Sequence, residues 1–201
     1  MKRLSLLLVG ILSAVLVFSV VGFGTEMDSA STILTFNDLL VISVTDDSLN
    51  DLTFSQSDLE SYTDGDRENL GTVTVQTWSL TDYSVGATFK SPNGNNTNTG
   101  LFEIKGDAII TSWQELGHYS WSGSAKDNKP SNSDINSGVV VDLTPEFGDT
   151  TEVTTASPNW PDGTSKGFSL QLNLGLMEKV ISGNNSFDIN FWIYEGAIPA
   201  S

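Results

Sequence analysis

The feature that most constrains the fold of this chain is the alternation of apolar and polar residues in many short stretches. In FSLQLNLGL, residues 168–176, Phe168 and four leucines occupy every second position. Successive side chains of a β-strand point to opposite faces, so this alternation predicts a strand with one apolar and one polar face. The one stretch that reads as helical is QSDLES at 56–61, a single turn after a serine cap. The chain is therefore predicted to be all-β.

Further strands are predicted wherever the same alternation recurs between polar turns. Turn formers such as SPNGNNTNTG and SGNN separate these stretches. Many short strands joined by polar turns are typical of an antiparallel β-sandwich, here immunoglobulin-like or jelly-roll-like. The outer face of each sheet is then expected to be exposed to solvent. The chain shows no internal repeat and no linker, so residues 25–201 are predicted to form a single domain. The remaining predicted strands are 32–36, 39–45, 52–55, 71–78, 83–90, 101–105, 108–113, 118–122, 138–143, 151–155 and 187–194.

Residues 1–24 have the layout of a helical secretory signal peptide. Lys2 and Arg3 precede an uncharged run that is rich in Leu and Val, and this run ends in Gly22-Phe23-Gly24. A charged start, an apolar middle and a small-x-small end predict cleavage after Gly24. An uncleaved anchor is the alternative, because about 20 apolar residues can span a bilayer. We expect the mature protein to be secreted or at the cell surface, extracellular or periplasmic, without membrane contact after cleavage.

Charge argues against two classes of partner. Cleavage after Gly24 removes two of the nine basic residues and none of the 25 acidic ones, so the mature charge is 7 − 25 = −18. Such a surface repels nucleic acid and anionic lipid. The chain contains no Cys, so the stability of an exported domain must come from its core or from partners and not from disulfides.

The inventory of side chains argues against catalysis. His118 is the only His, there is no Cys, and no G-x-S-x-G motif precedes a predicted helix, so thiol, zinc and serine-hydrolase chemistry lack their usual groups. Glycoside hydrolysis needs only two carboxylates, and Glu103 and Glu115, near Trp113, are candidates for it. With 25 acidic residues, such pairs arise freely in this chain. We therefore predict a protein that is not an enzyme, and keep a glycoside hydrolase as the third alternative.

An acidic turn is a candidate calcium site. In TDGDRENL, residues 63–70, Asp64, Asp66 and Glu68 alternate, so their oxygens can converge on one hard cation. Arg67 interrupts the pattern, and the sixth place of the turn lacks the glycine of an EF-hand loop. Calcium is the one cofactor predicted, and a solvated acidic turn is the alternative.

Three aromatic residues are candidates for sugar binding. Tyr119 and Trp121 are two positions apart and share a strand face, and Trp113 lies on an adjacent segment. Flat rings on a β-surface can stack on the apolar face of a pyranose while Asn, Asp or Gln side chains fix its hydroxyls. The alternative is that these rings fill the core or cover sheet edges, as large aromatic residues do. A surface polysaccharide is therefore one predicted partner.

The stretch WSLTDYSVGATF, residues 78–89, resembles the first Trp-x-Leu element of the WxL-type cell-surface domains of Gram-positive bacteria. The second Trp-x-Leu of those domains lies near the C-terminus, where this chain has Trp192-Ile193-Tyr194 instead. Those domains are secreted β-rich modules held non-covalently at the peptidoglycan. The resemblance implies cell-wall binding as a candidate function.

The stretch FDINFWIY, residues 187–194, predicts a strand with large aromatic residues on its second face. Its first face should pack on the apolar side of 168–176, and the connection is long enough for a hairpin. Trp192 and Tyr194 then point the other way and need cover. We expect cover from the chain's own loops first, with 157–166 as the lid, and an interface with a partner second. The residues expected to be buried are Phe187, Ile189, Phe191 and Ile193.

The leading functional prediction is a structural or adhesive protein of the cell surface that assembles with itself or with other surface proteins. The signal peptide, the dense strand pattern and the missing catalytic groups support it. Residues 32–44 form an apolar stretch that can complete the sheet of a neighbour, as added strands do, or pair within its own domain. The rival prediction is a carbohydrate-binding module.

Overall fold

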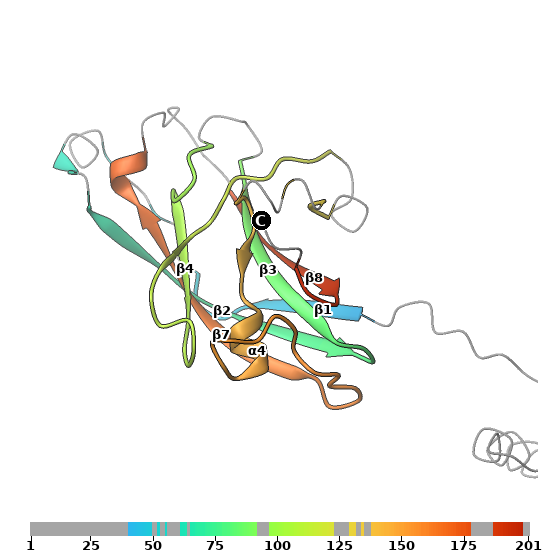
Figure 1. Cartoon of the computed structure of the whole chain (residues 1–201). Coiled ribbons are helices and arrows are strands. Elements are labelled where there is room, and N and C mark those ends of the chain that lie inside the picture. Colours follow the sequence, from blue (N-terminus) through green and yellow to red (C-terminus); the bar gives the residue numbers. More distant parts are fainter. Residues whose placement is uncertain are drawn as a thin grey trace, which may run out of the picture. The chain divides into compact units, whose positions relative to one another are not determined.

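Strands dominate the computed structural model of the chain (Figure 1). The structure describes residues 40–49, 52, 55, 61–63, 65–91, 97–122, 129–131, 134, 138–177 and 187–198. All of them belong to one compact unit that runs from Asn37 to Ser201. The predicted signal peptide and its cleavage point lie outside the described residues. Within those residues, no helix has the length and apolar character needed to cross a membrane.

The strands form two antiparallel sheets. The larger sheet has the order β1-β2-β7-β4-β5 and the smaller has the order β6-β3-β8, and neighbouring strands pair antiparallel throughout. The predicted all-β class is therefore confirmed. The described residues also form the short helix α4 (Thr144–Gly148) and the 3-10 turn η2 (Leu174–Leu176). The strands are β1 (Leu40–Asp46), β2 (Arg67–Ser79), β3 (Tyr83–Lys90), β4 (Phe102–Gly106), β5 (Gln114–Glu115), β6 (Val141–Asp142), β7 (Thr164–Asn173) and β8 (Asp188–Glu195).

Alternation decides which face of β2 enters the core. Val73 and Val75 are buried, whereas Thr72 on the opposite face is exposed. The register with β7 shifts at Gly71, whose φ of +113° lies in the left-handed region that favours glycine. A Cβ at this position would lie 2.1 Å from the carbonyl oxygen of Ser48. Glycine therefore allows the chain that leaves β1 to pass close to β2.

One hydrophobic core takes residues from both sheets. Val75, Ile104 and Phe168 enter it from the larger sheet, and Val85 and Phe89 enter it from the smaller one. All five are fully buried. Each such side chain stabilises the fold by about 1.5–3 kcal/mol relative to its exposed state. The shared core therefore ties the two sheets into one unit.

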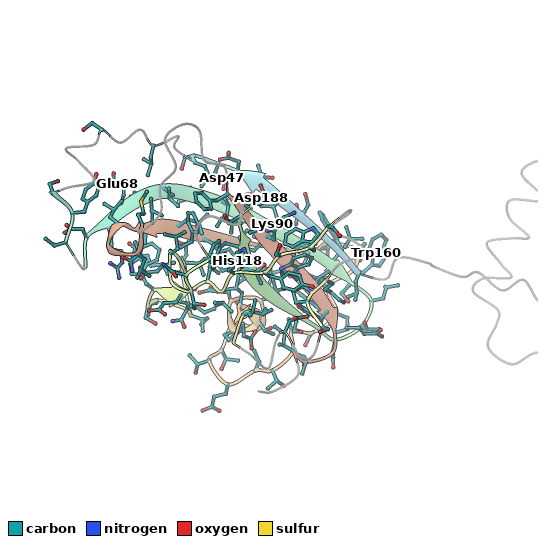
Figure 2. All side chains as sticks on the ribbon, turned by 90° about the horizontal axis from the view of Figure 1, so that it is seen from above. Asp47, Glu68, Lys90, His118, Trp160 and Asp188 are labelled. Carbon is teal, nitrogen blue, oxygen red and sulfur yellow. The ribbon has the colours of Figure 1, made fainter. Side chains whose placement is uncertain are left out.

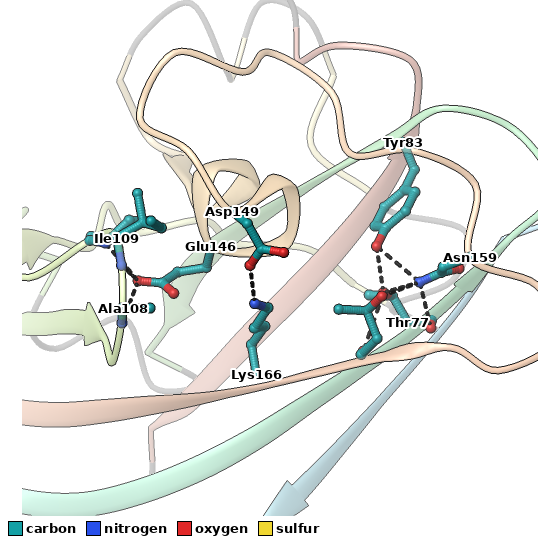
Figure 3. A network of polar contacts seen from close by, with 10 residues as sticks. Thr77, Tyr83, Ala108, Ile109, Glu146, Asp149, Asn159 and Lys166 are labelled. Atoms are coloured by element: carbon teal, nitrogen blue, oxygen red, sulfur yellow. Dashed lines mark hydrogen bonds and ion pairs between the residues drawn. The ribbon is translucent and has the colours of Figure 1, made fainter.

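The strand predicted at 108–113 is absent, because its first N–H groups bind a carboxylate. The backbone N–H groups of Ala108, Ile109 and Ile110 lie 3.4, 2.8 and 2.6 Å from Oε1 of the buried Glu146 (Figure 3). Gly106 permits this approach, since a Cβ there would lie 2.0 Å from the same oxygen. Donors that serve a carboxylate are not available to a neighbouring strand.

Several other predicted elements differ from the structure. Residues 118–122 make only a single bridge, from His118 to Phe89, and 151–155 form turns instead of a strand. The strand predicted at 138–143 is reduced to the two residues of β6. Helix α4 was not predicted, because its five residues are too few to show a helical period. The predicted strand 32–36 and most of 52–55 and 56–61 lie outside the described residues.

Strand β8 joins the sheet that does not contain β7. It pairs antiparallel with β3, so the hairpin predicted between 168–176 and 187–194 is wrong. The packing expected across the core is confirmed, because the rings of Phe168 and Phe191 lie 6.0 Å apart. Phe191 is buried, whereas Phe187, Ile189 and Ile193 are only half-buried against the core.

Asn159 fixes the connection that precedes β7 to the end of β2. Its Nδ2 lies 3.0–3.1 Å from the hydroxyl oxygen of Tyr83 and from Oγ1 and the carbonyl oxygen of Thr77 (Figure 3). Its Oδ1 accepts a hydrogen bond of 2.7 Å from the backbone N–H of Ser79. Because Thr77 belongs to β2 and Tyr83 to β3, this single amide contacts both sheets.

Candidate functional site

Four aromatic residues gather on the outer face of the three-stranded sheet, and we call them the ring cluster. Trp192 and Tyr194 of β8 form its base and are only 5% and 6% exposed. Tyr119 and Trp121 pack against them and are half-buried. The expected cover by the chain's own residues is therefore confirmed. Val140 and Ile198 complete the cluster.

The lid predicted for these rings is wrong. Residues 157–166 do not supply the rings that pack on Trp192, because Asn159 holds this segment at the end of β2. Trp160 stays 61% exposed, and Figure 2 shows it at the end of the β-unit opposite to Glu68. The cover comes instead from the segment around Tyr119, which was predicted as a strand.

Two glycines allow the covering segments to lie close to the sheet and to each other. Gly86 of β3 is the register partner of Trp192, and a Cβ there would lie 2.4 Å from a methyl group of Val140. A Cβ at Gly117 would lie 2.3 Å from the carbonyl oxygen of Val139. A glycine inside a clear strand pattern can mark the close approach of another segment. Gly86, within 83–90, is therefore the sequence signal for the cover on this outer face.

The rings of the cluster are in contact with one another and with Lys90. Tyr119 and Trp121 stack at 5.6 Å with an angle of 26° between their planes. Trp192 meets both edge-on, at 6.0 and 5.2 Å, and Nζ of Lys90 lies 4.3 Å from the centre of the Trp121 ring. A sugar that stacks on a ring needs an open face, and these contacts use the surface that it would need.

The ring cluster also holds buried polar atoms. Nε1 of Trp192 donates a hydrogen bond of 2.9 Å to Oγ1 of Thr88. Ser84 and Tyr194 are register partners, and both buried hydroxyls lack a hydrogen-bond partner among the described residues. Burial raises the pKa of Tyr194 above the ordinary value for tyrosine. Nζ of Lys129 lies 4.6 Å from the centre of the Tyr194 ring, and burial lowers the pKa of this lysine.

Trp113, the third predicted sugar contact, belongs to a different surface. It is 36% exposed, and its ring centre lies 4.9 Å from Nζ of Lys105 in β4. Lys105 alternates with the core residue Ile104, so it lies on the outer face of the five-stranded sheet. The structure thus brings Tyr119 and Trp121 together and gives Trp113 different neighbours.

The two candidate glycosidase carboxylates are close but in different environments. Glu103 and Glu115 are register partners on β4 and β5. The buried Glu103 accepts hydrogen bonds of 3.1 and 3.0 Å from Nε of Arg67 and a further one from Gln171. Arg67 also donates to Asn173 at 2.9 Å. This arrangement is an ion pair between the buried Glu103 and the more exposed Arg67, with hydrogen-bonded neighbours, and Glu115 is exposed.

The acidic turn predicted to bind calcium is described only in part, because Asp64 lies outside the described residues. Oδ2 of Asp66 accepts hydrogen bonds of 2.7 and 3.1 Å from the backbone N–H and the hydroxyl of Thr63. Glu68 is half-buried at the start of β2. Among the residues that the structure describes, no three His, Asp or Glu side chains form a group that could hold a metal ion. Calcium binding by the complete turn stays a prediction.

Strand β1 forms one edge of the five-stranded sheet. Within the described part of the chain it pairs with β2 alone. Val41 and Val44 are 41% and 47% exposed. Residues 40–44 of the stretch proposed for strand donation therefore pair within their own chain, and residues 32–39 lie outside the described residues.

The outer face of β1, β2 and β7 is rich in hydroxyl groups, and we call it the hydroxyl face. From Thr72 to Trp78 of β2 and from Ser165 to Ser169 of β7, its strand residues alternate with core residues such as Val73 and Phe168 and are uncharged, although the chain has 34 charged residues, 9 basic and 25 acidic. The strand pattern alone did not reveal this face, because it depends on which strands are neighbours. Its members are Val41, Ser43, Thr45, Thr72, Thr74, Gln76, Trp78, Ser165, Gly167 and Ser169.

Together these features define a two-sheet all-β protein in which β1 is an edge strand, aromatic rings cover the outer face of the smaller sheet, and β1, β2 and β7 carry a hydroxyl-rich outer face. The chain matches no protein-family model, and a search of curated proteins gives no match either. The resemblance of 78–89 to a Trp-x-Leu element therefore gains no support from these comparisons. In the structure, Trp78 and Trp192 lie in different sheets.

Proposed function

We propose that this chain is a secreted, non-enzymatic structural or adhesive protein of the cell surface, which associates with copies of itself or with other surface proteins through the edge of β1. The observation that carries the proposal is this edge, which presents exposed Val41 and Val44 and pairs on one side only among the described residues. Unpaired N–H and C=O groups of an edge strand are a template for a further strand.

We also propose that the two sheets form a β-sandwich of the immunoglobulin-like or jelly-roll-like kind. The shared core supports this, because fully buried residues of β2, β4 and β7 and of β3 belong to one cluster. Rings of the two sheets also meet across it, as Phe168 and Phe191 do. Inner faces that interdigitate in this way are typical of sandwiches.

The composition of β1 favours pairing with another strand. Proteins protect edge strands with Lys, Pro, bulges or inward-pointing charges. Between Leu40 and Thr45 the strand has none of these residue types and no register shift against β2. Its only charge is Asp46 at the C-terminal end.

The negative charge at the C-terminal end of β1 determines how two copies of the strand would be oriented when they pair. Parallel pairing of β1 with a second β1 would bring Asp46 and Asp47 of both copies to the same end. Antiparallel pairing places them at opposite ends and avoids repulsion between like charges. Two copies paired in this way make a two-fold, self-complementary contact.

The proposal is tested by the oligomeric state of the exported protein, measured by sedimentation over a range of concentrations. Val44→Asp adds a carboxylate to the exposed edge and should shift association to at least tenfold higher concentration. Leu49→Asp is the matched control, since Leu49 is 40% exposed but follows β1. A wild-type protein that remains a monomer at all concentrations, or equal association of both variants, would contradict the proposal.

Carbohydrate or cell-wall binding is the second candidate function. Trp113 favours it, since this ring is partly exposed beside Lys105 and near the polar side chains of the five-stranded sheet. The ring cluster favours it less, because its rings contact one another.

A further inference from the structure

We propose that the hydroxyl face binds an uncharged polysaccharide. This inference rests on the adhesive role proposed above and names a ligand class for it. The face belongs to three neighbouring strands, β1, β2 and β7. Ser165 and Thr72 are exposed on it, and Thr74 and Gln76 are half-buried.

Register places hydroxyl and amide groups in rows across the strands. Ser43, Gln76 and Ser165 form one row, and Thr45 and Thr74 begin the next. Neighbouring strands lie about 4.8 Å apart, a distance comparable with the length of one pyranose ring. A sugar chain laid along the first row thus meets a polar side chain at each of the three strands, and the second row has one on β1 and on β2.

Trp78 provides an aromatic ring at one end of the face. The ring is half-buried, and the backbone of Gly163 lies against it, since a Cβ there would lie 2.5 Å from Nε1 of Trp78. A ring held by backbone loses little conformational freedom when a ligand binds. Its aromatic face is suited to the apolar face of a sugar.

The face continues toward Trp113. Thr72 pairs with Ser169, and Ser169 pairs with Lys105, whose amine lies beside the Trp113 ring. From Trp78 to Thr72 the distance along β2 is six residues, or about 20 Å at 3.4 Å per residue. Rings therefore lie near both ends of a polar strip that is long enough for several sugar units.

Two carboxylates reach this strip from the side. Oγ1 of Thr74 donates a hydrogen bond to Asp47, and a side chain at Gly167 would meet the carboxylate of Asp107. Carboxylates accept hydrogen bonds from sugar hydroxyls, and they repel anionic polymers. Together with a net charge of −16, they select an uncharged glycan over an acidic one or an anionic lipid surface.

Hydroxyl-rich ligands also fit this face better than a second copy stacked on it. Two such faces pressed together would bury many Ser, Thr and Gln groups, and each would need a partner to avoid a desolvation cost. A polysaccharide brings donors and acceptors along its length.

Native affinity electrophoresis of the full exported protein tests the proposal, with gels that contain hydroxyethylcellulose, galactomannan or dextran. Polygalacturonate is the anionic comparison. We expect at least one neutral polysaccharide to retard the protein and polygalacturonate not to do so. Trp78→Ala and Ser165→Tyr should each weaken the retarding interaction at least tenfold. The second variant adds bulk to an exposed position and guards against a folding defect in the first. Ser120→Tyr is the matched control, because Ser120 is exposed on the segment that covers the other sheet.

Three results would overturn the inference: no retardation in any neutral gel, equal retardation in polygalacturonate, or unchanged retardation of both variants in the face. None of them bears on the self-association of β1, which Val44→Asp tests separately. A wild-type protein that stays a monomer at all concentrations but is retarded by a neutral polysaccharide would refute the proposed function and leave the hydroxyl face as a binding site.

Discussion

Trp192 is a residue that strand alternation assigns to an outer face but that other segments of the chain bury. Alternation assigns it to the outer face of β8, yet it is 5% exposed and donates a hydrogen bond to Thr88. We expect Trp192→Ala to lower the free energy of unfolding by about 3–5 kcal/mol, because it removes a large buried ring and leaves a cavity. Chemical denaturation followed by circular dichroism measures this loss.

The control for Trp192 is another tryptophan of the same chain. Trp160→Ala should change the free energy of unfolding by less than about 0.5 kcal/mol, since Trp160 is 61% exposed. Equal effects of the two substitutions would contradict the packing of the ring cluster. A neutral Trp192→Ala with lost association would instead place this ring at a partner interface.

His118 makes the stability of the fold depend on pH. Its ring packs 5.3 Å from that of Phe89, and burial lowers its pKa below the ordinary value of 6.5. The unfolded chain therefore binds a proton at higher pH than the folded chain does. The stability from the neutral imidazole is fully present above pH 6.5 and is lost as pH falls through the lower folded pKa.

The change in unfolding free energy between pH 7 and pH 5 measures this effect. His118→Gln cannot titrate, so its free energy of unfolding should vary less over this interval than that of the wild type. Carboxylates titrate mostly below this interval, with ordinary pKa values near 4. Identical pH dependence of the two proteins would refute the role assigned to His118.

At the scale of elements, the sequence predicts those strands whose hydrogen bonds come from other strands. Alternation places 83–90 at the bounds of β3 and 187–194 within one residue of β8. It fails for 108–113, where Glu146 of the distant helix α4 takes up the N–H groups. A local pattern carries no information on such a distant carboxylate, and none on which strands become neighbours.

The candidate site shows the same limit. Spacing predicts that Tyr119 and Trp121 share a strand face, whereas the structure has no strand there and stacks the two rings on each other over Trp192. Trp113 is close in sequence to both, but it lies beside Lys105 of the other sheet. The hydroxyl face requires the register of three strands, β1, β2 and β7, which no single stretch encodes.

For the whole molecule, the edge strand β1 and the hydroxyl face support each other under the two proposals. Antiparallel pairing of two β1 strands would join two five-stranded sheets and place their hydroxyl faces side by side on one surface. Sugar chains are repetitive, so a second linked site raises the effective concentration and strengthens binding without a new contact. Association and glycan binding should then reinforce each other.

Calcium binding by the acidic turn would change the stability of the whole domain. If Asp64, Asp66 and Glu68 hold one ion, millimolar calcium should raise the melting temperature, because a ligand that binds only the folded state stabilises it. A hundredfold excess over Kd corresponds to about 2.7 kcal/mol, and each kcal/mol shifts the melting temperature by about 2–4 °C for a domain of this size. Scanning calorimetry measures the shift.

Sodium and magnesium distinguish a bound ion from general screening of the net charge of −16. Sodium at matched ionic strength reduces repulsion between all carboxylates, so it should have a smaller effect than a site-bound ion. Magnesium should also do less than calcium, since it holds its water molecules more tightly. Glu68→Gln should remove the shift specific to calcium and keep the response to sodium, because it changes a single ligand. Equal shifts with calcium and sodium would show that screening alone acts on this chain.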